Sequence, residues 1–268
     1  MRSIRAATVC LLLLAAFLAI GADLLAPYGY ATQFRDHPNA PPSRKFFLGT
    51  DALGRDRFSR LLYGGRISLL CAPAAALAAT ALAAIIGLFA GYLGGWVKEI
   101  ADGATDLFLS LPWLFALLTL RALLPLDLPP WSSIASTFLL LAAVGWASGA
   151  RVVGASVARL RAAPPILHAR AAGCPESRVL WLHILPNLRP ILVAQFWILV
   201  PVFLLTEANL GALGLGIAEP TPSWGNMLAE LQNYQLVLEA PWILAPAVLL
   251  FVILSGLHFV VSGGTTWE

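Results

Sequence analysis

Long apolar runs alternate with shorter polar stretches along most of the chain. The first run covers residues 6–26, and the others cover residues 67–93, 104–124, 132–150, 191–205 and 242–261. A helix needs about 20 apolar residues to cross the hydrocarbon core of a bilayer, so each run is long enough, or nearly so, for a tilted transmembrane helix. The pattern predicts an all-α membrane protein with about six transmembrane helices.

The first run follows Arg2 and Arg5, as the apolar part of a secretory signal peptide would. The apolar region of a signal peptide is typically only about 7 to 15 residues long, however. The greater length of this run favours a membrane helix that is retained.

The composition excludes a soluble domain. Of the 268 residues, 59% are hydrophobic and 12% are charged, and the mean hydropathy is +0.79, whereas soluble domains carry about 25% charged residues. The net charge is only +3, which gives no strong electrostatic case for binding nucleic acid. We therefore expect a lipid bilayer, and no nucleic acid, among the partners.

The polar stretches divide the chain into four parts. We expect an N-terminal transmembrane helix at 1–26, an external loop at 27–66, a transmembrane core at 67–262 and a C-terminal tail at 263–268. Within the core, a polar loop at 151–190 separates the fourth and fifth helices, and an external segment covers residues 206–240.

The distribution of charge predicts the orientation in the membrane. The 151–190 loop has one acid, Glu176, against six arginines, which are Arg151, Arg159, Arg161, Arg170, Arg178 and Arg189. The positive-inside rule places such a loop in the cytoplasm. The 206–240 segment has no Lys or Arg and carries Glu207, Glu219, Glu230 and Glu239. It therefore belongs outside, and both termini then fall in the cytoplasm.

The 27–66 loop is an exception to this rule. It must lie outside, although its basic residues are Arg35, Arg44, Lys45, Arg55, Arg57, Arg60 and Arg66. Long translocated loops partly escape the rule, and the 151–190 loop is bracketed by two strong apolar runs. The predicted orientation therefore rests on the 151–190 loop.

Motifs for ATP hydrolysis, hydrolytic catalysis and metal binding are missing from the sequence. The only lysines, Lys45 and Lys98, precede Phe and Glu, so there is no phosphate-binding loop of the G-x-x-x-x-G-K-[ST] type. No H-E-x-x-H pair or G-x-S-x-G turn is present, and the spacing of Cys10, Cys71 and Cys174 suits neither a metal site nor a disulfide framework. We expect no catalytic residue, no metal and no cofactor, so any ATP must be hydrolysed by a separate subunit.

Three glycines recur at four-residue spacing in the second apolar run, at Gly87, Gly91 and Gly95. This spacing aligns small residues on one helical face and lets another helix approach closely, so it predicts a packing face. A hinge that flexes during transport is the alternative, and packing is the commoner use of such a face.

The 151–190 loop contains the sequence RLRAAPPILHARAAGCPESRVLWLHILPNLRP, from Arg159 to Pro190. Pro164 and Pro165 suit the first turn of one short helix, and Gly173 suits its left-handed end. Pro175 suits the first turn of a second helix, which would reach Ile184. By composition alone, a solvated basic loop that only fixes the topology explains the segment equally well.

The order of residues in this loop resembles the cytoplasmic EAA loop of ABC-importer permeases. In that loop a Gly follows a short coupling helix, and an I-x-L-P or I-L-P element comes later; here these are Gly173 and Ile184-Leu185-Pro186. Leu167 and His168 stand where the motif has its Glu and first Ala, and only Ala169, Arg170, Ala171 and Gly173 match there. Without that Glu, one possible charged contact to an ATPase is lost, so either the partner surface has adapted or the coupling is weak.

Two further stretches are similar to the dipeptide, oligopeptide and nickel branch of this family. They are FLGTDALGRDRFSRLLYGGRISL, beginning at Phe47, and LGLGIAEPTPSWGNML, from Leu213 to Leu228. With GLFAGYLGGW, from Gly87 to Trp96, between them, the resemblance covers nearly the whole chain. It implies the fold of a type I ABC-importer permease, with the coupling helix between the fourth and fifth transmembrane helices.

The resemblance also implies partners and site residues. The partners would be a homologous permease, two ABC ATPase subunits and an extracytoplasmic substrate-binding protein, in the cytoplasmic (inner) membrane. The residues expected at the ATPase are Pro165, Leu167, His168, Ala169, Arg170, Ala171, Gly173, Cys174, Glu176 and Ser177. Those expected at an external gate or docking surface are Glu207, Gly214, Gly216, Pro222, Trp224 and Asn226. An interfacial aromatic anchor explains Trp224 at least as well as docking does.

The resemblance implies a subunit of a peptide importer that is not itself an enzyme. It leaves the cargo open among a dipeptide, a longer peptide, a nickel chelate and glutathione. A stand-alone ion-coupled carrier or channel is the main alternative. It would require buried charges within the spans or inverted repeats. Asp106, near the cytoplasmic start of the third run, stands where this branch of the family often has an Asp. An acid at the membrane boundary is by default a candidate for a functional role, and at a helix N-terminus it would instead complement the dipole, which is the interpretation that we favour. Lys98, Glu99 and Asp102 are expected in a short cytoplasmic turn.

Overall fold

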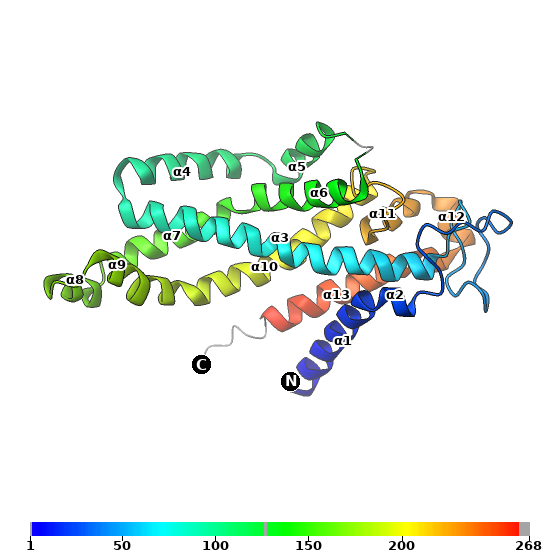
Figure 1. Cartoon of the computed structure of the whole chain (residues 1–268), viewed down its shortest axis with the longest axis horizontal. Coiled ribbons are helices and arrows are strands. Elements are labelled where there is room, and N and C mark those ends of the chain that lie inside the picture. The colour runs from blue at the N-terminus through cyan, green and yellow to red at the C-terminus, as the bar shows by residue number, and fades with distance from the viewer. Residues whose placement is uncertain (1, 126–127, 263–268) are drawn as a thin grey trace. The chain divides into compact units, whose positions relative to one another are not determined.

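The computed structural model describes residues 2–125 and 128–262, and these residues are predominantly helical (Figure 1). Within them, β-structure is confined to two isolated bridges, Gln33 with Arg55 and Thr50 with Asp56. The tail predicted at 263–268 lies outside the described residues. The all-α prediction is therefore confirmed for the part of the chain that the structure describes.

Four helices in the described ranges are long and apolar enough to cross a membrane. They cover Arg57–Leu93, Pro130–Arg161, Glu176–Ala212 and Pro241–Val261. A fifth crossing is possible if the bent pair Gly95–Ser110 and Trp113–Ala122, which turns by 86°, forms one span. The apolar helix Ala6–Ile20 is shorter. Four or five spans are thus supported among these residues, against the six predicted.

The chain divides into two compact units. The first contains the chain up to Ala72, then Arg121–Phe138 and the chain from Pro201 onward, and the second contains Pro73–Leu120 and Leu139–Val200. The helices α3 (Arg57–Leu93), α6 (Pro130–Gly145) and α10 (Leu185–Ala212) each contribute to both units.

The first unit is built on α1 (Arg2–Ile20) and α13 (Ala245–Ser262), which pack side by side (Figure 1). Arg66 in α3 donates from Nε to the carbonyl of Ala19 (3.2 Å) and from Nη2 to the carbonyl of Ile20 (2.8 Å). These are orphan carbonyls at the C-terminal end of α1, where a cation also complements the helix dipole. The remaining elements of this unit are α2 (Ala22–Leu25), α11 (Trp224–Leu228), α12 (Tyr234–Glu239) and the 3₁₀ turns η2 (Ala229–Gln232) and η3 (Pro241–Leu244).

The glycines that were predicted to form a packing face lie in the second unit, and two of the three act as predicted. A Cβ at Gly87 would lie 2.6 Å from the Ala150 carbonyl oxygen, and one at Gly91 would lie 2.4 Å from the Gly154 carbonyl oxygen. These two glycines therefore let α3 touch the backbone of α7 (Ala147–Arg161), as a packing face requires. Gly95 does not share this role: its φ is +52° and a Cβ there would meet nothing within 4 Å, because it begins α4 (Gly95–Ser110) after a turn.

Several helices are longer than the apolar runs from which they were predicted. Helix α3 begins at Arg57, not Ile67, so part of the predicted 27–66 loop is helical. Helix α7 continues to Arg161 and α10 reaches Ala212, which shortens both the 151–190 loop and the 206–240 segment. An apolar run marks only the part of a helix that lies in hydrocarbon, whereas polar residues continue the same helix beyond it.

The third predicted span is interrupted. Its sequence forms α4 and then α5 (Trp113–Ala122), with Leu111 in an extended conformation between them. Pro112 explains the break, because the residue before a proline is disfavoured in the helical region and proline itself donates no backbone hydrogen bond.

Candidate functional site

The predicted pair of short helices is present between α7 and α10. Helix α8 covers Pro164–Ala171 with prolines in its first turn, and Gly173 follows it with φ +79°. Helix α9 (Glu176–Arg178) begins directly after Pro175. The second helix does not end at Ile184 as predicted, because the π-helical turns η1 (Val179–Ile184) carry it without interruption into α10.

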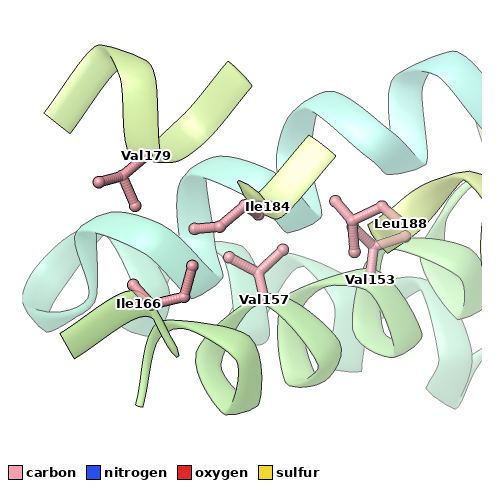
Figure 2. Close-up of a cluster of buried hydrophobic side chains, with 6 residues drawn as sticks. All are labelled: Val153, Val157, Ile166, Val179, Ile184 and Leu188. Atoms are coloured by element: carbon pink, nitrogen blue, oxygen red, sulfur yellow. The ribbon is translucent and has the colours of Figure 1, made fainter. Parts of the chain in front are cut away.

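Helix α8 is fixed to the second unit through one buried side chain. Ile166 packs in a cluster whose other buried members are Val153 and Val157 from α7, Val179 and Ile184 from η1, and Leu188 from α10 (Figure 2). Ile166 is the only residue of α8 in this cluster, and it faces both neighbouring elements. Because such clusters are densely packed, a displacement of α8 must move α7 and the start of α10 with it.

The rest of α8 and the following turn is open to a partner. Of the residues predicted to meet an ATPase, Pro165, Leu167, His168, Ala171, Gly173, Glu176 and Ser177 are exposed, and Ala169, Arg170 and Cys174 are half-buried. The structure thus brings all ten residues together around one short helix and leaves most of them uncovered.

Arg170 and Glu176, which we predicted to make polar contacts with a partner, pair with each other. Arg170 Nη2 donates to Glu176 Oε2 over 2.9 Å, and the Tyr92 hydroxyl donates to the same carboxylate. The Arg170 guanidinium also lies 5.8 Å from the centre of the Tyr92 ring. This arrangement holds the turn around Gly173 against the end of α3.

Asp106 is not at a helix N-terminus, so the dipole interpretation is wrong. It lies in the second half of α4, and its carboxylate forms an ion pair with Arg151 of α7. Lys98 and Asp102 are also helical and form an i,i+4 pair over 2.5 Å, instead of lying in a turn. A pocket of about 290 Å³ beside these pairs includes Gly91 and Gly154 in its walls. Helix α4 is therefore tied to α7 by charge as well as by packing.

We expect the Asp106 and Arg151 pair to show coupling in a charge swap. Asp106→Arg or Arg151→Asp alone places like charges opposite each other and should lower the unfolding free energy by about 1 kcal/mol. The double swap restores the pair in reverse and should recover at least half of that loss. Thermal unfolding of the four proteins in one detergent measures the cycle, and strictly additive losses would contradict the pairing.

Three of the basic residues at 27–66 form ion pairs with acids of the 206–240 segment in the first unit. Arg55 Nη1 lies 2.6 Å from Glu219 Oε2, and Arg60 Nη2 lies 2.9 Å from Glu219 Oε1. Arg57 forms a further ion pair with Glu230. Two acids of the 206–240 segment thus balance part of the positive charge at 27–66, and these ion pairs explain how the two segments can share one side of the membrane.

Asp51 organises the centre of this network. Its Oδ1 accepts hydrogen bonds from the backbone N–H groups of Leu53 (2.9 Å) and Arg55 (2.8 Å). Its Oδ2 accepts from Arg55 Nε (2.6 Å), and Arg60 Nε lies 3.8 Å away. The roles of Asp51, Arg55 and Arg60 were missed in the sequence, although the unmatched charges of the two segments were a usable signal.

Two residues predicted at an external gate or docking surface are buried. Glu207 lies within α10, and its Oε2 accepts from Ser68 Oγ over 3.1 Å. Trp224 is 2% exposed, and its Nε1 donates to the carbonyl of Leu61 over 3.0 Å. Glu207 is thus a buried residue of α10, not an exposed docking residue, and Trp224 is neither an interfacial anchor nor an exposed docking residue in this unit.

Of the other four predicted docking residues, Gly214, Gly216 and Pro222 lie between α10 and α11, and Asn226 lies in α11. Gly214 is exposed with φ +75°, Gly216 and Pro222 are buried, and Asn226 is half-buried. Asn226 Nδ2 donates to the carbonyl of Ile217 over 2.5 Å. Gly214 is therefore the residue of this set that a partner can reach without rearrangement of the turn.

The residues that the structure describes contain no group of three or more His, Cys, Asp or Glu side chains that could hold a metal ion. Several ion pairs among these residues join separate helices or loops, and α8 is an exposed surface helix. Together with the long apolar helices, these features are those of a membrane protein.

Comparison with known proteins agrees with this conclusion. Residues 83–263 match the family described as the binding-protein-dependent transport system inner membrane component. The chain belongs to this family, as its motifs predicted, and it is a transport component of the inner membrane.

Three relatives are similar to this protein over almost the whole chain. The oligopeptide transport system permease protein OppC of Bacillus subtilis is 31% identical over 254 residues, covering 94% of this chain and 81% of the relative. The dipeptide transport system permease protein DppC of Alkalihalophilus pseudofirmus is 31% identical over 260 residues, covering 96% and 83%. The di/tripeptide transport system permease protein DppC of Pseudomonas aeruginosa is 32% identical over 258 residues, covering 94% and 82%.

Proposed function

We propose that the chain is a permease subunit of an ATP-driven importer of short peptides. The observation that carries this proposal is the similarity, over at least 94% of the chain, to permeases named for oligopeptide, dipeptide and di/tripeptide transport. A homologous permease would complete the translocation path, two ATPase subunits would supply the energy, and an extracytoplasmic binding protein would deliver the peptide.

In this proposal the chain crosses the membrane about six times, with α1 as the first span and both termini in the cytoplasm. The arginines around α8 lie on the cytoplasmic side, and the segment of Glu219 and Glu230 lies outside. The charge pattern supports this topology, because Arg55, Arg57 and Arg60 at 27–66 pair with acids of the 206–240 segment, whereas one acid, Glu176, faces the six arginines of the 151–190 loop.

Helix α8 is the proposed contact with an ATPase. It is short and exposed, and Ile166 anchors it to α7 and α10, so a push on its outer face is transmitted into the second unit. The position where the family motif has Glu carries Leu167 here, and its side chain is 50% exposed. We infer that this contact is apolar and steric, and that Arg170 and Glu176 shape the turn instead of reaching the ATPase.

The test is co-purification with the partner permease and ATPases, followed by ATPase assays in lipid. Leu167→Glu places a charge in the proposed contact and should reduce ATPase co-purification about tenfold, because burying an unpaired charge in an interface costs more than 1.4 kcal/mol. Leu53→Glu is the matched control, since Leu53 is 51% exposed and lies in the proposed outer loop.

Equal co-purification of the two variants would contradict an apolar contact at Leu167, since Glu is the residue of the family motif at this position. If the unaltered chain neither binds the ATPases nor changes their turnover, yet moves solute alone down an ion gradient, the importer proposal fails in favour of a stand-alone carrier.

A further inference from the structure

A pocket in the first unit has the composition of a site for a small ligand. It has a volume of about 360 Å³, within the range of about 300 to 1,000 Å³ that is typical of small-molecule sites. Its walls come from four separate segments of the unit and include Asp23, Tyr30, Tyr63, Arg66, Trp131 and Thr221. The topology proposed above places it on the outer side of the membrane.

Aromatic side chains form part of its apolar walls, beside aliphatic residues such as Ile67 and Ile134. The rings of Tyr30 and Tyr63 meet edge to face, with their centres 5.1 Å apart. Trp131, at the start of α6, lines the same pocket and is 82% exposed. An exposed indole beside two tyrosines offers flat surfaces on which an apolar or aromatic side chain can stack.

Two opposite charges lie in the wall of the same pocket. Arg66 Nη2 is 2.8 Å from Asp23 Oδ2, and the guanidinium lies 5.4 Å from the centre of the Tyr63 ring. Hydrogen bonds from Arg66 and from Tyr63 hold the pKa of Asp23 below its ordinary value, so this carboxylate is ionised at neutral pH.

Both charges remain open to further partners. The Asp23 side chain is 67% exposed. The hydrogen bonds that Arg66 forms with described residues use Nε and Nη2, which leaves Nη1 to bind a carboxylate. A ligand with both an ammonium and a carboxylate could therefore engage each charge without leaving the other unpaired.

We propose that this pocket binds short zwitterionic peptides that carry an apolar side chain, so that the permease itself contacts its cargo. The proposal rests on the peptide importer function proposed above and adds a binding site within this subunit. The ammonium would lie at Asp23, the carboxylate at Arg66 Nη1, and the side chain against Tyr63 and Trp131.

The probe is phenylalanylalanine carrying a diazirine, added to the purified chain in nanodiscs of phosphatidylglycerol, with adducts located by mass spectrometry. We expect adducts on the pocket segments and about tenfold weaker competition by the N-acetylated or C-amidated dipeptide, because each block removes one charge-assisted hydrogen bond. Trp131→Ala and Tyr63→Leu should each reduce labelling by a similar factor. Trp181→Ala is the matched control, since Trp181 is exposed and lies outside the pocket.

Asp23→Asn keeps the size and an acceptor oxygen and should still reduce labelling by the free dipeptide. Labelling that persists in both aromatic variants, or competition that is indifferent to blocked termini, would overturn the proposal. A second arm uses nanodiscs of phosphatidylethanolamine, whose headgroup is also zwitterionic. Adducts that disappear there while that lipid is retained on the chain would assign the site to lipid and overturn the peptide assignment.

This result is separable from that of the co-purification test. A pocket that labels in a chain that binds no ATPase leaves the site standing without the importer. Peptide uptake by an assembled importer whose pocket does not label refutes the site alone.

Discussion

Gly91→Ala is expected to destabilise the protein by about 1 to 3 kcal/mol, although it adds only one methyl group. The new Cβ would lie 2.4 Å from the carbonyl oxygen of Gly154 and 2.7 Å from Cβ of Val157. A rotamer change can relieve neither contact, because one is with a backbone oxygen and the other is with a Cβ atom, which no side-chain rotation moves. Helices α3 and α7 must therefore separate, and thermal unfolding in detergent should show a midpoint several degrees lower.

Gly103→Ala is the matched control for this substitution. Gly103 is inside α4, and a Cβ there would meet nothing within 4 Å. Since alanine is a better helix former than glycine by about 1 kcal/mol, this variant should be neutral or more stable. The same chemical change should thus have opposite effects at the two positions, and equal midpoints would contradict the close packing of α3 on α7.

The consequence of the Gly91 substitution extends to the coupling proposal. Val157 packs in the cluster that also holds Ile166 of α8. If α7 is pushed away from α3, it would keep its contact with α8 through Ile166, but it would lose its close packing against α3. Where the Gly91→Ala protein still assembles, we expect ATP hydrolysis to persist while peptide uptake falls.

The sequence was sufficient to predict what depends on local chemistry. The apolar runs predicted the helical class, and prolines and Gly173 predicted the two short helices around α8, because proline and glycine restrict or extend backbone conformation at the residue itself. The glycine spacing predicted a close helix contact at Gly87 and Gly91, because a residue without a side chain lets another helix approach. Family membership followed from motifs that extend over most of the chain.

Features that depend on distant residues were not predictable in this way. Glu207 and Trp224 were assigned to an outer surface because polar and aromatic residues often mark one, but α10 extends past Glu207, and Trp224 is enclosed by the first unit. Asp106 was placed at a helix start because the apolar run began there, whereas its helix begins at Gly95. For Glu207 and Asp106, hydropathy located the apolar part of a helix but not its ends, and for Trp224 it could not show which segments enclose the ring.

Asp51→Asn is expected to cost about 3 kcal/mol or more, the second large effect that the structure predicts. Asp51 is 2% exposed and lies against the buried Arg55 and Arg60. The amide keeps one oxygen for the backbone N–H groups of the loop, so the substitution removes mainly the charge. Removing one partner from a buried ion pair typically costs about 3 to 5 kcal/mol, because the remaining charge is left uncompensated.

Three further variants separate this explanation from a general effect of lost charge. Asp36→Asn removes the same charge from an exposed side chain and should change stability by less than about 0.5 kcal/mol. Glu219→Gln should have an intermediate effect, since Glu219 contacts both arginines but is 52% exposed and partly screened by water. Arg35→Gln tests whether lowering the positive charge of the loop matters by itself, and it should not reproduce the loss.

If Asp51→Asn is no less stable than Asp36→Asn, the network does not hold the loop to the 206–240 segment. The balance of basic and acidic residues would then no longer explain how both segments lie on one side of the membrane.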